Sequence, residues 1–279
     1  MAEYKGIVGT KIRNYTTNPD NPIEGEVWYN ETDNVLKFQY PNLTTAGSWA
    51  TGGSLNTGRY HLAGAGIYTA ALAIAGSEDP PNVTNVESYN GSNWTEITDV
   101  NTARELLGAA GTQTSALAFG GFAPPATAAT ELWNGSNWTE VNDLSTARHS
   151  LGDAGSSNTS ALAFGGNSTQ FWAVTESWNG TNWTEVNDLN IAKVQMASFG
   201  TQPSAIACNA STPSPSTRVN TEDWNGVSWQ ETSDMSVSGY AGGAAGTATA
   251  GLVGGRNGSP SAATEEWNVP SNTVKVLTD

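Results

Sequence analysis

One phrase that recurs about every 45 residues restricts the possible folds of this chain more than any other feature. It reads TELWNGSNWTEVNDLSTAR at residues 130–148, and similar phrases occupy residues 86–104, 175–193 and, more weakly, 221–239. The tryptophan that follows the Asn-Gly turn in each copy (Trp94, Trp138, Trp183 and Trp229) follows the previous one by 44, 45 and 46 residues. A period of this length is typical of architectures in which one supersecondary unit repeats and packs on its neighbours.

Each repeat is predicted to form four short β-strands. In one unit, LGAAG (107–111) and ALAF (116–119) are the first two strands, and TELW (130–133) and WTEV (138–141) are the last two. The Asn-Gly between the last two is a strong hairpin signal, and the glycine pair after ALAF accepts positive φ. No segment sustains an apolar stripe with a period of 3.6 residues, so we predict an all-β protein.

These signals resemble the kelch family of β-propeller repeats. In that family a Gly-Gly pair ends the second strand, an E-x-aromatic strand follows, and a Trp and an Arg lead into the next blade. The matching residues of one unit are Gly120-Gly121, Glu131-Leu132-Trp133, Trp138 and Arg148, and the resemblance covers about residues 45–274. Two copies depart from it, because IACNA (206–210) replaces one glycine pair and Gly239 stands where the other units have a cation.

The number of inner-strand segments predicts five four-stranded blades. These segments lie near residues 62–66, 107–111, 151–155, 196–200 and 241–246. The last unit has Val274 in place of its outer tryptophan, whereas Trp49 lies 45 residues before Trp94. We therefore expect a strand at Trp49 to complete the last blade and close the ring, which would cover an unpaired edge.

Two domains are predicted. Residues 45–279 form the propeller, and residues 1–44 form a small N-terminal β module whose EVWYN and VLKFQ segments make a hairpin. The final TVKVLTD is surplus to the ring and is expected to pair with this hairpin.

Composition argues against several functions. The chain has 11 Lys and Arg against 26 Asp and Glu, a net charge of −15, so we expect no nucleic acid partner. One Cys and two His leave little for metal or acid–base chemistry, and we expect no catalytic residue, no metal and no cofactor. A galactose-oxidase-like copper site or a sialidase-like arginine cluster would need residues that the chain lacks. We also expect no membrane insertion and no signal peptide.

One glutamate recurs in the T-E-x-W strand of every unit, at Glu87, Glu131, Glu176, Glu222 and Glu265. A ring of carboxylates could hold a cation. We favour an architectural role, in which each glutamate accepts backbone N–H groups or binds the Arg that opens an inner strand.

The segment between the second and third strands differs from one unit to the next, and it is the candidate binding region. Loops on a rigid scaffold commonly carry recognition, and equivalent loops lie on a common face. The predicted ligand-binding residues are Phe122, Phe171, Trp172, Arg218 and Arg256. The alternative is that the loops are unconstrained and Trp172 caps the core.

The N-terminal phrase GEVWYNETDNVLKF, followed by copies of NGTNWTEV, also resembles virion structural proteins of bacteriophages that infect marine bacteria. That resemblance implies a non-enzymatic tail fibre, neck or head appendage protein, made in the host cytoplasm and carried on the phage particle. Its partners would be other virion proteins, through residues 1–44, and a host surface glycan. A free carbohydrate-binding, lectin-like propeller is the alternative, and a glycosidase or oxidase is a third, less favoured hypothesis.

Overall fold

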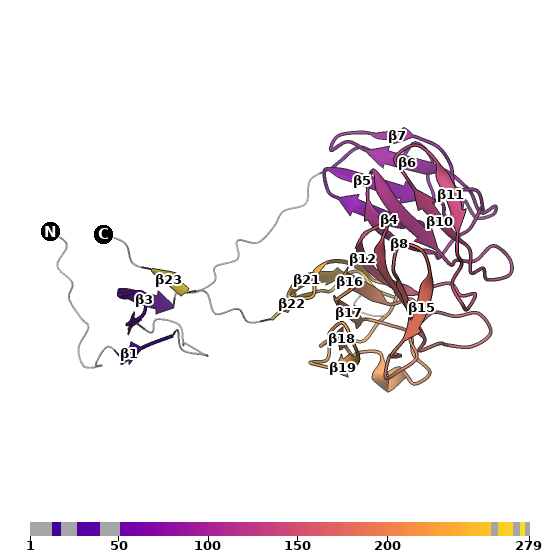
Figure 1. Cartoon of the computed structure of the whole chain (residues 1–279). Helices are drawn as coiled ribbons and strands as arrows, with labels where there is room; N and C mark the ends of the chain where they lie inside the picture. Colours follow the sequence, from indigo (N-terminus) through magenta and orange to yellow (C-terminus); the bar gives the residue numbers. More distant parts are fainter. Residues whose placement is uncertain (1–12, 18–26, 40–50, 258–261, 270–273, 277–279) are drawn as a thin grey trace. The chain divides into compact units, whose positions relative to one another are not determined.

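The computed structural model describes residues 13–17, 27–39, 51–257, 262–269 and 274–276 (Figure 1). The chain divides into two compact units, residues 51–269 and residues 1–50 together with 270–279. The C-terminal ten residues therefore group with the smaller unit, which differs from the predicted 45–279 domain. Trp49 lies outside the described residues, so closure at this position stays a prediction.

The smaller unit contains one four-stranded sheet in the order β1-β2-β3-β23. Its strands are β1 (Arg13–Tyr15), β2 (Val27–Asn30), β3 (Val35–Gln39) and β23 (Val274–Val276). The predicted hairpin is confirmed as β2 and β3, and the side-chain oxygen of Asn30 accepts the N–H groups of Thr32 and Asp33 in its turn. β23 pairs antiparallel with β3, as expected for the surplus segment.

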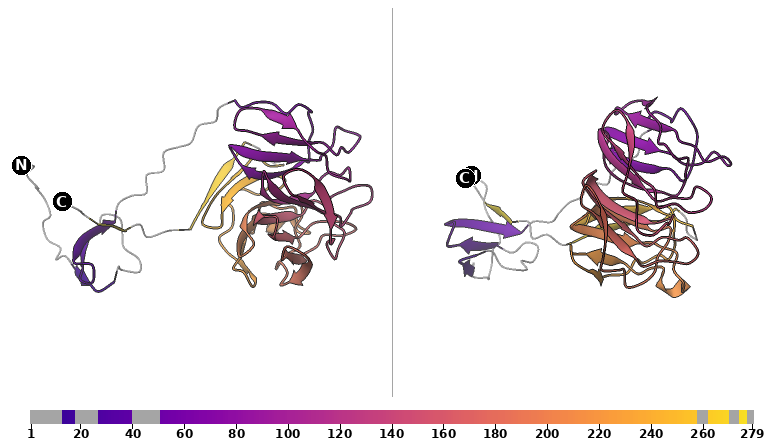
Figure 2. Two further views of the ribbon diagram at one scale, coloured as in Figure 1. Left: turned by 45° about the horizontal axis from the view of Figure 1, so that its top comes forward. Right: turned by 45° about the vertical axis from the view of Figure 1, so that its right-hand side comes forward.

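Among the described residues, the larger unit contains five antiparallel sheets, each made from consecutive strands (Figures 1 and 2). The first two consist of β4 (Ala63–Ile67), β5 (Ala70–Ile74), β6 (Val86–Tyr89) and β7 (Trp94–Glu96), and of β8 (Gly108–Thr112), β9 (Ser115–Phe119), β10 (Thr130–Trp133) and β11 (Trp138–Val141). The third and fourth consist of β12 (Gly152–Ser157), β13 (Ser160–Phe164), β14 (Thr175–Trp178) and β15 (Trp183–Val186), and of β16 (Ala197–Thr201), β17 (Ser204–Cys208), β18 (Glu222–Trp224) and β19 (Trp229–Glu231). The fifth has three strands, β20 (Gly243–Thr247), β21 (Ala250–Gly254) and β22 (Thr264–Asn268).

Helix is nearly absent from the described ranges. The single helical element is a 3₁₀ turn, Pro215–Thr217, and no described helix has the length and apolarity needed to cross a bilayer. The all-β prediction therefore holds, and the five inner strands begin and end within one or two residues of the predicted segments.

The inner strands β4, β8, β12, β16 and β20 lie side by side in chain order. Small residues make this approach possible. A Cβ added to Gly152 would lie 2.4 Å from the Phe164 ring and 2.6 Å from the sulfur of Met196. The fourth unit keeps its loop geometry without the glycine pair, because Asn209 adopts φ 48° where Gly120 has φ 64°. Asparagine is among the few other residues that enter this region readily.

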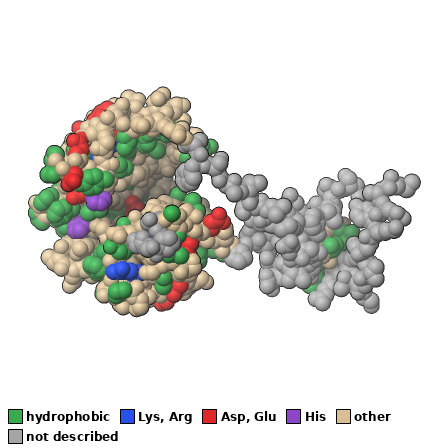
Figure 3. Space-filling model, turned by 180° about the vertical axis from the view of Figure 1, so that it is seen from behind, with side chains coloured by type: hydrophobic (Ala, Val, Ile, Leu, Met, Phe, Trp, Pro, Cys, Tyr) green, Lys and Arg blue, Asp and Glu red, His purple; other side chains and the backbone are tan. Residues whose placement is uncertain are grey.

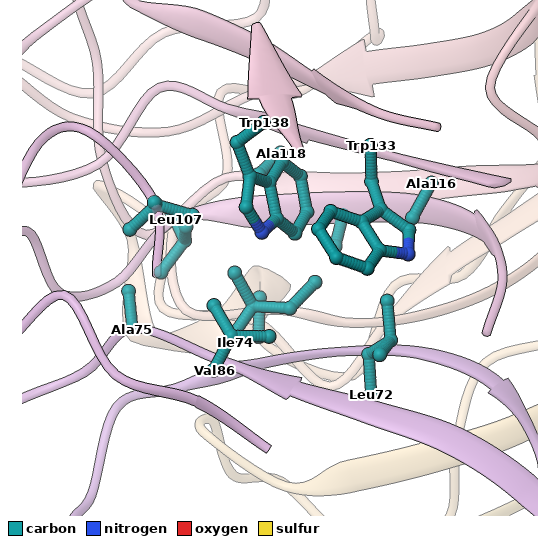
Figure 4. Close-up of a cluster of buried hydrophobic side chains, with 12 residues drawn as sticks. Leu72, Ile74, Ala75, Val86, Leu107, Ala116, Ala118, Trp133 and Trp138 are labelled. Carbon is teal, nitrogen blue, oxygen red and sulfur yellow. The ribbon is translucent and has the colours of Figure 1, made fainter. Parts of the chain in front are cut away.

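Neighbouring sheets pack by one recurring arrangement. One face of the first sheet, with Leu72, Ile74 and Val86, lies against Trp133 and Trp138 of the second (Figure 4). Equivalent aromatic contacts join Phe119 to Trp183 and Phe164 to Trp229, with ring centroids 4.9 and 4.7 Å apart. Because burying one such ring removes about 150–250 Å² from water, these tryptophans are major anchors of the unit.

The first and last sheets each have one face that is less covered than its equivalents. Leu252 of β21 is 37% exposed, whereas Leu117 and Leu162, its equivalents, are fully buried. A cavity of about 430 Å³ is lined by Ala71 and Trp94 of the first sheet and also by Ala109 of β8 and Gly155 of β12. The space-filling view in Figure 3 shows the hollowed side of this unit.

Candidate functional site on the loop face

The repeated glutamates are held inside the sheets. Glu131 accepts the backbone N–H and side-chain amide of Asn101, both at 2.7 Å, and pairs with Arg104 at 3.2 Å. The same ion pair forms in the other units between Arg59 and Glu87, Arg148 and Glu176, Lys193 and Glu222, and Arg256 and Glu265. The architectural interpretation is confirmed, because backbone groups and a buried cation already occupy these carboxylates.

The electrostatics of these pairs also favour a fixed structural role. Burial alone would raise the pKa of Glu87, but hydrogen bonds from Asn56, Arg59 and Thr57 outweigh it and lower the pKa. For Arg104, burial lowers the pKa while the Glu131 carboxylate opposes that change. A carboxylate held this way accepts hydrogen bonds and is a poor proton donor at neutral pH.

Arg256 lies elsewhere than predicted. Its side chain is fully buried, and it donates to the carbonyl of Val237 at 2.6 Å and to Glu265 at 3.0 Å. A Cβ added to Gly239 would lie 2.6 Å from Cδ of Arg256, so the guanidinium fills the place that a cation at position 239 would take. Arg256 is thus the structural cation of the fifth sheet, and the prediction that it binds a ligand is wrong because its side chain is buried and engaged.

The variable loops are tethered to one face. In each unit, the residue after the repeat cation, or after Gly239 in the fifth, forms a β-bridge with the start of the loop. These bridges join Tyr60 to Ser77, Glu105 to Phe122, His149 to Asn167, Val194 to Ser211 and Tyr240 to Asn257. All five loops therefore start beside the beginning of an inner strand, which confirms the expectation of a common face.

The other predicted residues lie on this face, in three different loops. Phe122 is half-buried, and its ring lies 5.2 Å from that of His149. Phe171 bridges back to Asn167, and the indole N–H of Trp172 donates to Ser168 at 3.1 Å. Arg218 lies over the ring of Tyr240 at 5.2 Å. The four residues share a face, and the first two loops touch where the Asn82 amide donates to the Phe122 carbonyl at 2.7 Å. No described contact joins the four predicted residues across different loops.

The sequence analysis missed a ring of residues at the centre of this face. They occur two positions after the repeat cation, or after Gly239, and have left-handed φ between 49° and 58°: His61, Leu106, Ser150, Gln195 and Ala241. From Leu106 to Ala241, each backbone N–H donates to the carbonyl of the previous member, at 2.7 to 2.9 Å. We call these five residues the rim. These residues share a backbone conformation and not a side-chain type. The signal that the sequence offers for them is their position, two residues after the repeat cation or Gly239.

The rim surrounds a cavity of about 280 Å³. Each of the five sheets contributes two consecutive residues, one from the rim and the next one along the chain. The second set is apolar and forms the floor: Leu62, Leu107, Leu151, Met196 and Gly242. The rim has imidazole, hydroxyl and amide side chains as well as Leu106 and Ala241.

His61 lines this cavity, and His149 directly precedes Ser150, which also lines it. Figure 3 shows both imidazoles, in purple, on one side of the larger unit. Nδ1 of His61 lies 2.7 Å from the Glu105 carboxylate, and Nδ1 of His149 lies 3.0 Å from the Ser150 hydroxyl. Burial lowers the pKa of His149, which nearby Glu105 only partly opposes, so this imidazole is neutral near pH 7. The sequence analysis selected neither histidine, nor Glu105, as a candidate site residue.

Metal and thiol chemistry have little support within the described ranges. No cluster of three or more His, Cys, Asp or Glu is arranged there to hold a metal ion. Cys208 is buried, and burial raises the pKa of its thiol to about 12.

Comparison with known proteins supports the fold. No family model matches this sequence, and no curated protein matches it. Among solved structures, the chain is similar to "Structure of YjhT", with a TM-score of 0.68 over 88% of this chain and 91% of that one. At 10% sequence identity this likeness shows the fold alone, which is of the β-propeller type.

Proposed function

We propose that the chain is a non-enzymatic recognition protein of a phage particle, built as a five-bladed kelch-like propeller. Its loop face would contact a host surface glycan or a neighbouring virion protein. The smaller unit would attach it to the particle.

One observation carries the recognition role. The repeated glutamate–cation pairs are engaged within the sheets, whereas the loop residues that differ between units gather on one face. Such a division separates a uniform scaffold from a variable surface, and variable loops on a rigid scaffold are a common site of recognition. Tyr60 and Phe122 supply aromatic rings there, and Glu105 supplies a carboxylate.

The phage assignment rests on the resemblance of the N-terminal phrase and the repeats to virion proteins. Mass spectrometry of purified particles tests it directly, and we expect peptides from both units in particles freed of host protein. Their absence, with the chain present in the infected cell, would contradict the assignment.

The recognition role is tested by measuring attachment of the labelled full-length chain to host cells. We expect the double variant Phe122→Ala, Trp172→Ala to lose at least about tenfold in binding, because aromatic anchors dominate such contacts. Val227→Ala is the matched control. Val227 is 68% exposed, and it lies in the turn between β18 and β19, away from the variable loops. Equal loss in both variants would contradict a role for the loop face.

A free lectin-like protein is the second candidate. It is favoured by the small cavity at the centre of the loop face, which a scaffold protein does not need. Glycan binding by the isolated chain, together with its absence from particles, would select this alternative.

A further inference from the structure

We propose that the 280 Å³ cavity within the rim binds one neutral sugar unit that carries an apolar substituent, such as an acetamido or methyl group. This inference deepens the proposed recognition function and rests on it for the class of ligand. It is carried by three features of the cavity: its backbone, its lining and its charge.

The first feature is the backbone of the rim. Its five residues carry side chains in a strained conformation that glycine would adopt more easily. All five rim residues have left-handed φ, and glycine adopts that region at least cost. The chain has 31 glycines and uses them at other left-handed positions, such as Gly120 and Gly165, but at none of the rim positions. Strained positions that keep side chains are candidates for function.

The lining combines an apolar floor with a polar edge. Leu107, Leu151 and Met196 line the floor and are otherwise almost completely buried. At the edge, the half-buried Gln195 amide has no hydrogen-bond partner among the described residues, and His61 is exposed. Pockets of this composition bind ligands by apolar contact and a few placed hydrogen bonds. The floor suits the substituent, and the edge suits ring hydroxyls.

The size of the cavity limits the ligand. Its volume of about 280 Å³ is near the lower end of the roughly 300–1,000 Å³ typical of ligand pockets. It therefore accommodates a single ring, with the rest of a glycan extending over the loops. Near the cavity, the 42% exposed Tyr60 packs against His61 of the rim, and Phe122 packs against His149, which precedes Ser150 of the rim, so both rings can offer a face for stacking.

The distribution of charge favours a neutral sugar over an acidic one. The chain has six Lys and Arg in residues 51–269, and five of them are buried in the glutamate pairs. The sixth, Arg218, lies over Tyr240. Tyr240 precedes the rim residue Ala241, so Arg218 is the one cation beside the rim among the described residues, and it is engaged with that ring. The Glu105 carboxylate, which lies against His61, accepts hydroxyl hydrogen bonds and repels carboxylates. A neutral sugar fits this surface.

The test is calorimetric titration of the full-length chain with N-acetylglucosamine and rhamnose, with glucose and glucuronic acid as comparisons. We expect saturable binding of N-acetylglucosamine, rhamnose or both, at least tenfold tighter than glucose, and no binding of glucuronic acid. Preference for glucuronic acid, or no difference among the four sugars, would overturn the proposal.

Glycine substitutions in the rim separate binding from folding. Gln195→Gly removes the amide at a left-handed position, so we expect an unchanged or higher melting temperature and at least tenfold weaker binding. Ala241→Gly makes the same backbone change but removes only a methyl group, and it should bind within twofold of the parent chain. Equal binding by the parent chain and Gln195→Gly would also overturn the proposal.

These experiments distinguish failure of the cavity proposal from failure of the proposed function. If host cells bind the Gln195→Gly variant as well as the parent chain, but not the Phe122→Ala, Trp172→Ala variant, the cavity proposal fails and recognition by the loops stands. If the sugar binds and the chain is absent from particles, the cavity proposal stands and the phage assignment fails.

Discussion

At the residue scale, Gly239 and Arg256 have exchanged the positions that glycine and the cation occupy in the other sheets. Arg256→Gly should therefore leave Glu265 without its cation. We expect a loss of about 2–3 kcal/mol, below the 3–5 kcal/mol of a fully buried pair because Glu265 is 22% exposed. The double variant Gly239→Arg, Arg256→Gly recreates the usual arrangement and should recover most of that loss in urea unfolding. A double variant no more stable than Arg256→Gly would contradict the exchange.

Asp153 gives a pH dependence that can be isolated. Its carboxylate accepts the Ala109 N–H at 2.7 Å and the Ser198 hydroxyl at 3.3 Å. Burial raises its pKa from 3.8 to about 6, and the hydrogen bonds from Ala109 and Ser198 only partly oppose that change. Between these values the folded chain holds a proton that the unfolded chain has lost, so this group's contribution to stability falls as pH rises and levels off above pH 6.

The Asp153→Asn variant removes that titration and keeps an oxygen that accepts the Ala109 N–H. We expect its unfolding free energy to exceed that of the parent chain by up to about 3 kcal/mol above pH 6, with the difference vanishing below pH 4. Urea unfolding at a series of pH values measures this difference. A difference that does not change with pH would show that Asp153 keeps its ordinary pKa.

Residue identity also decided what the sequence could predict. Glu131 and Trp138 were placed correctly because the same residue type recurs at each equivalent position. The rim residues were missed because they share a backbone conformation and a hydrogen-bond pattern, and neither is visible in side-chain identity. Arg256 was misassigned because its exchange with Gly239 broke the repeat at both positions at once.

At the element scale, the fifth sheet should open before the rest of the larger unit. It has three described strands with largely exposed side chains, whereas the other sheets have four strands. Cys208 on β17 packs with Ala248 and Val253 of this sheet, so its thiol reports their separation. We expect thiol labelling in urea below the unfolding transition, because local opening costs less free energy than global unfolding.

The comparison that checks this is between Cys208 labelling and tryptophan fluorescence across the same urea range. The buried thiol, whose pKa is raised to about 12, should be unreactive without urea at neutral pH. If the free energy of opening from labelling equals that of global unfolding, the fifth sheet does not open separately. The sequence indicated an irregular last unit through its missing tryptophan, but the extent of exposure depends on packing that no local pattern encodes.

At the scale of the whole larger unit, the less covered faces of the first and last sheets match each other: one offers an aromatic side chain and the other a leucine. Within the described ranges, the first three internal interfaces place the Leu of one sheet against an aromatic pair of the next, as Leu117 meets Trp178 and Trp183. The fourth places Ile206 in a cluster with Trp267 of the fifth sheet. By the same rule, Leu252 of the fifth sheet would meet Trp94 of the first. A closed five-bladed ring therefore requires these two side chains to be in contact, and this contact can be tested without knowing where Trp49 lies.

A double-mutant cycle on Leu252→Ala and Trp94→Ala tests that claim. If the ring closes, the two losses should be non-additive by about 0.5–3 kcal/mol, the range found for residues in contact. The Leu117→Ala and Trp183→Ala cycle across an internal interface is the matched control and should show coupling of that size. Additive losses for Leu252 and Trp94 beside a coupled control would mean that the first and last sheets do not meet in solution. The five sheets would then form an open arc, and the rim cavity would lack the fifth backbone link from His61 N–H to the Ala241 carbonyl that a closed ring supplies.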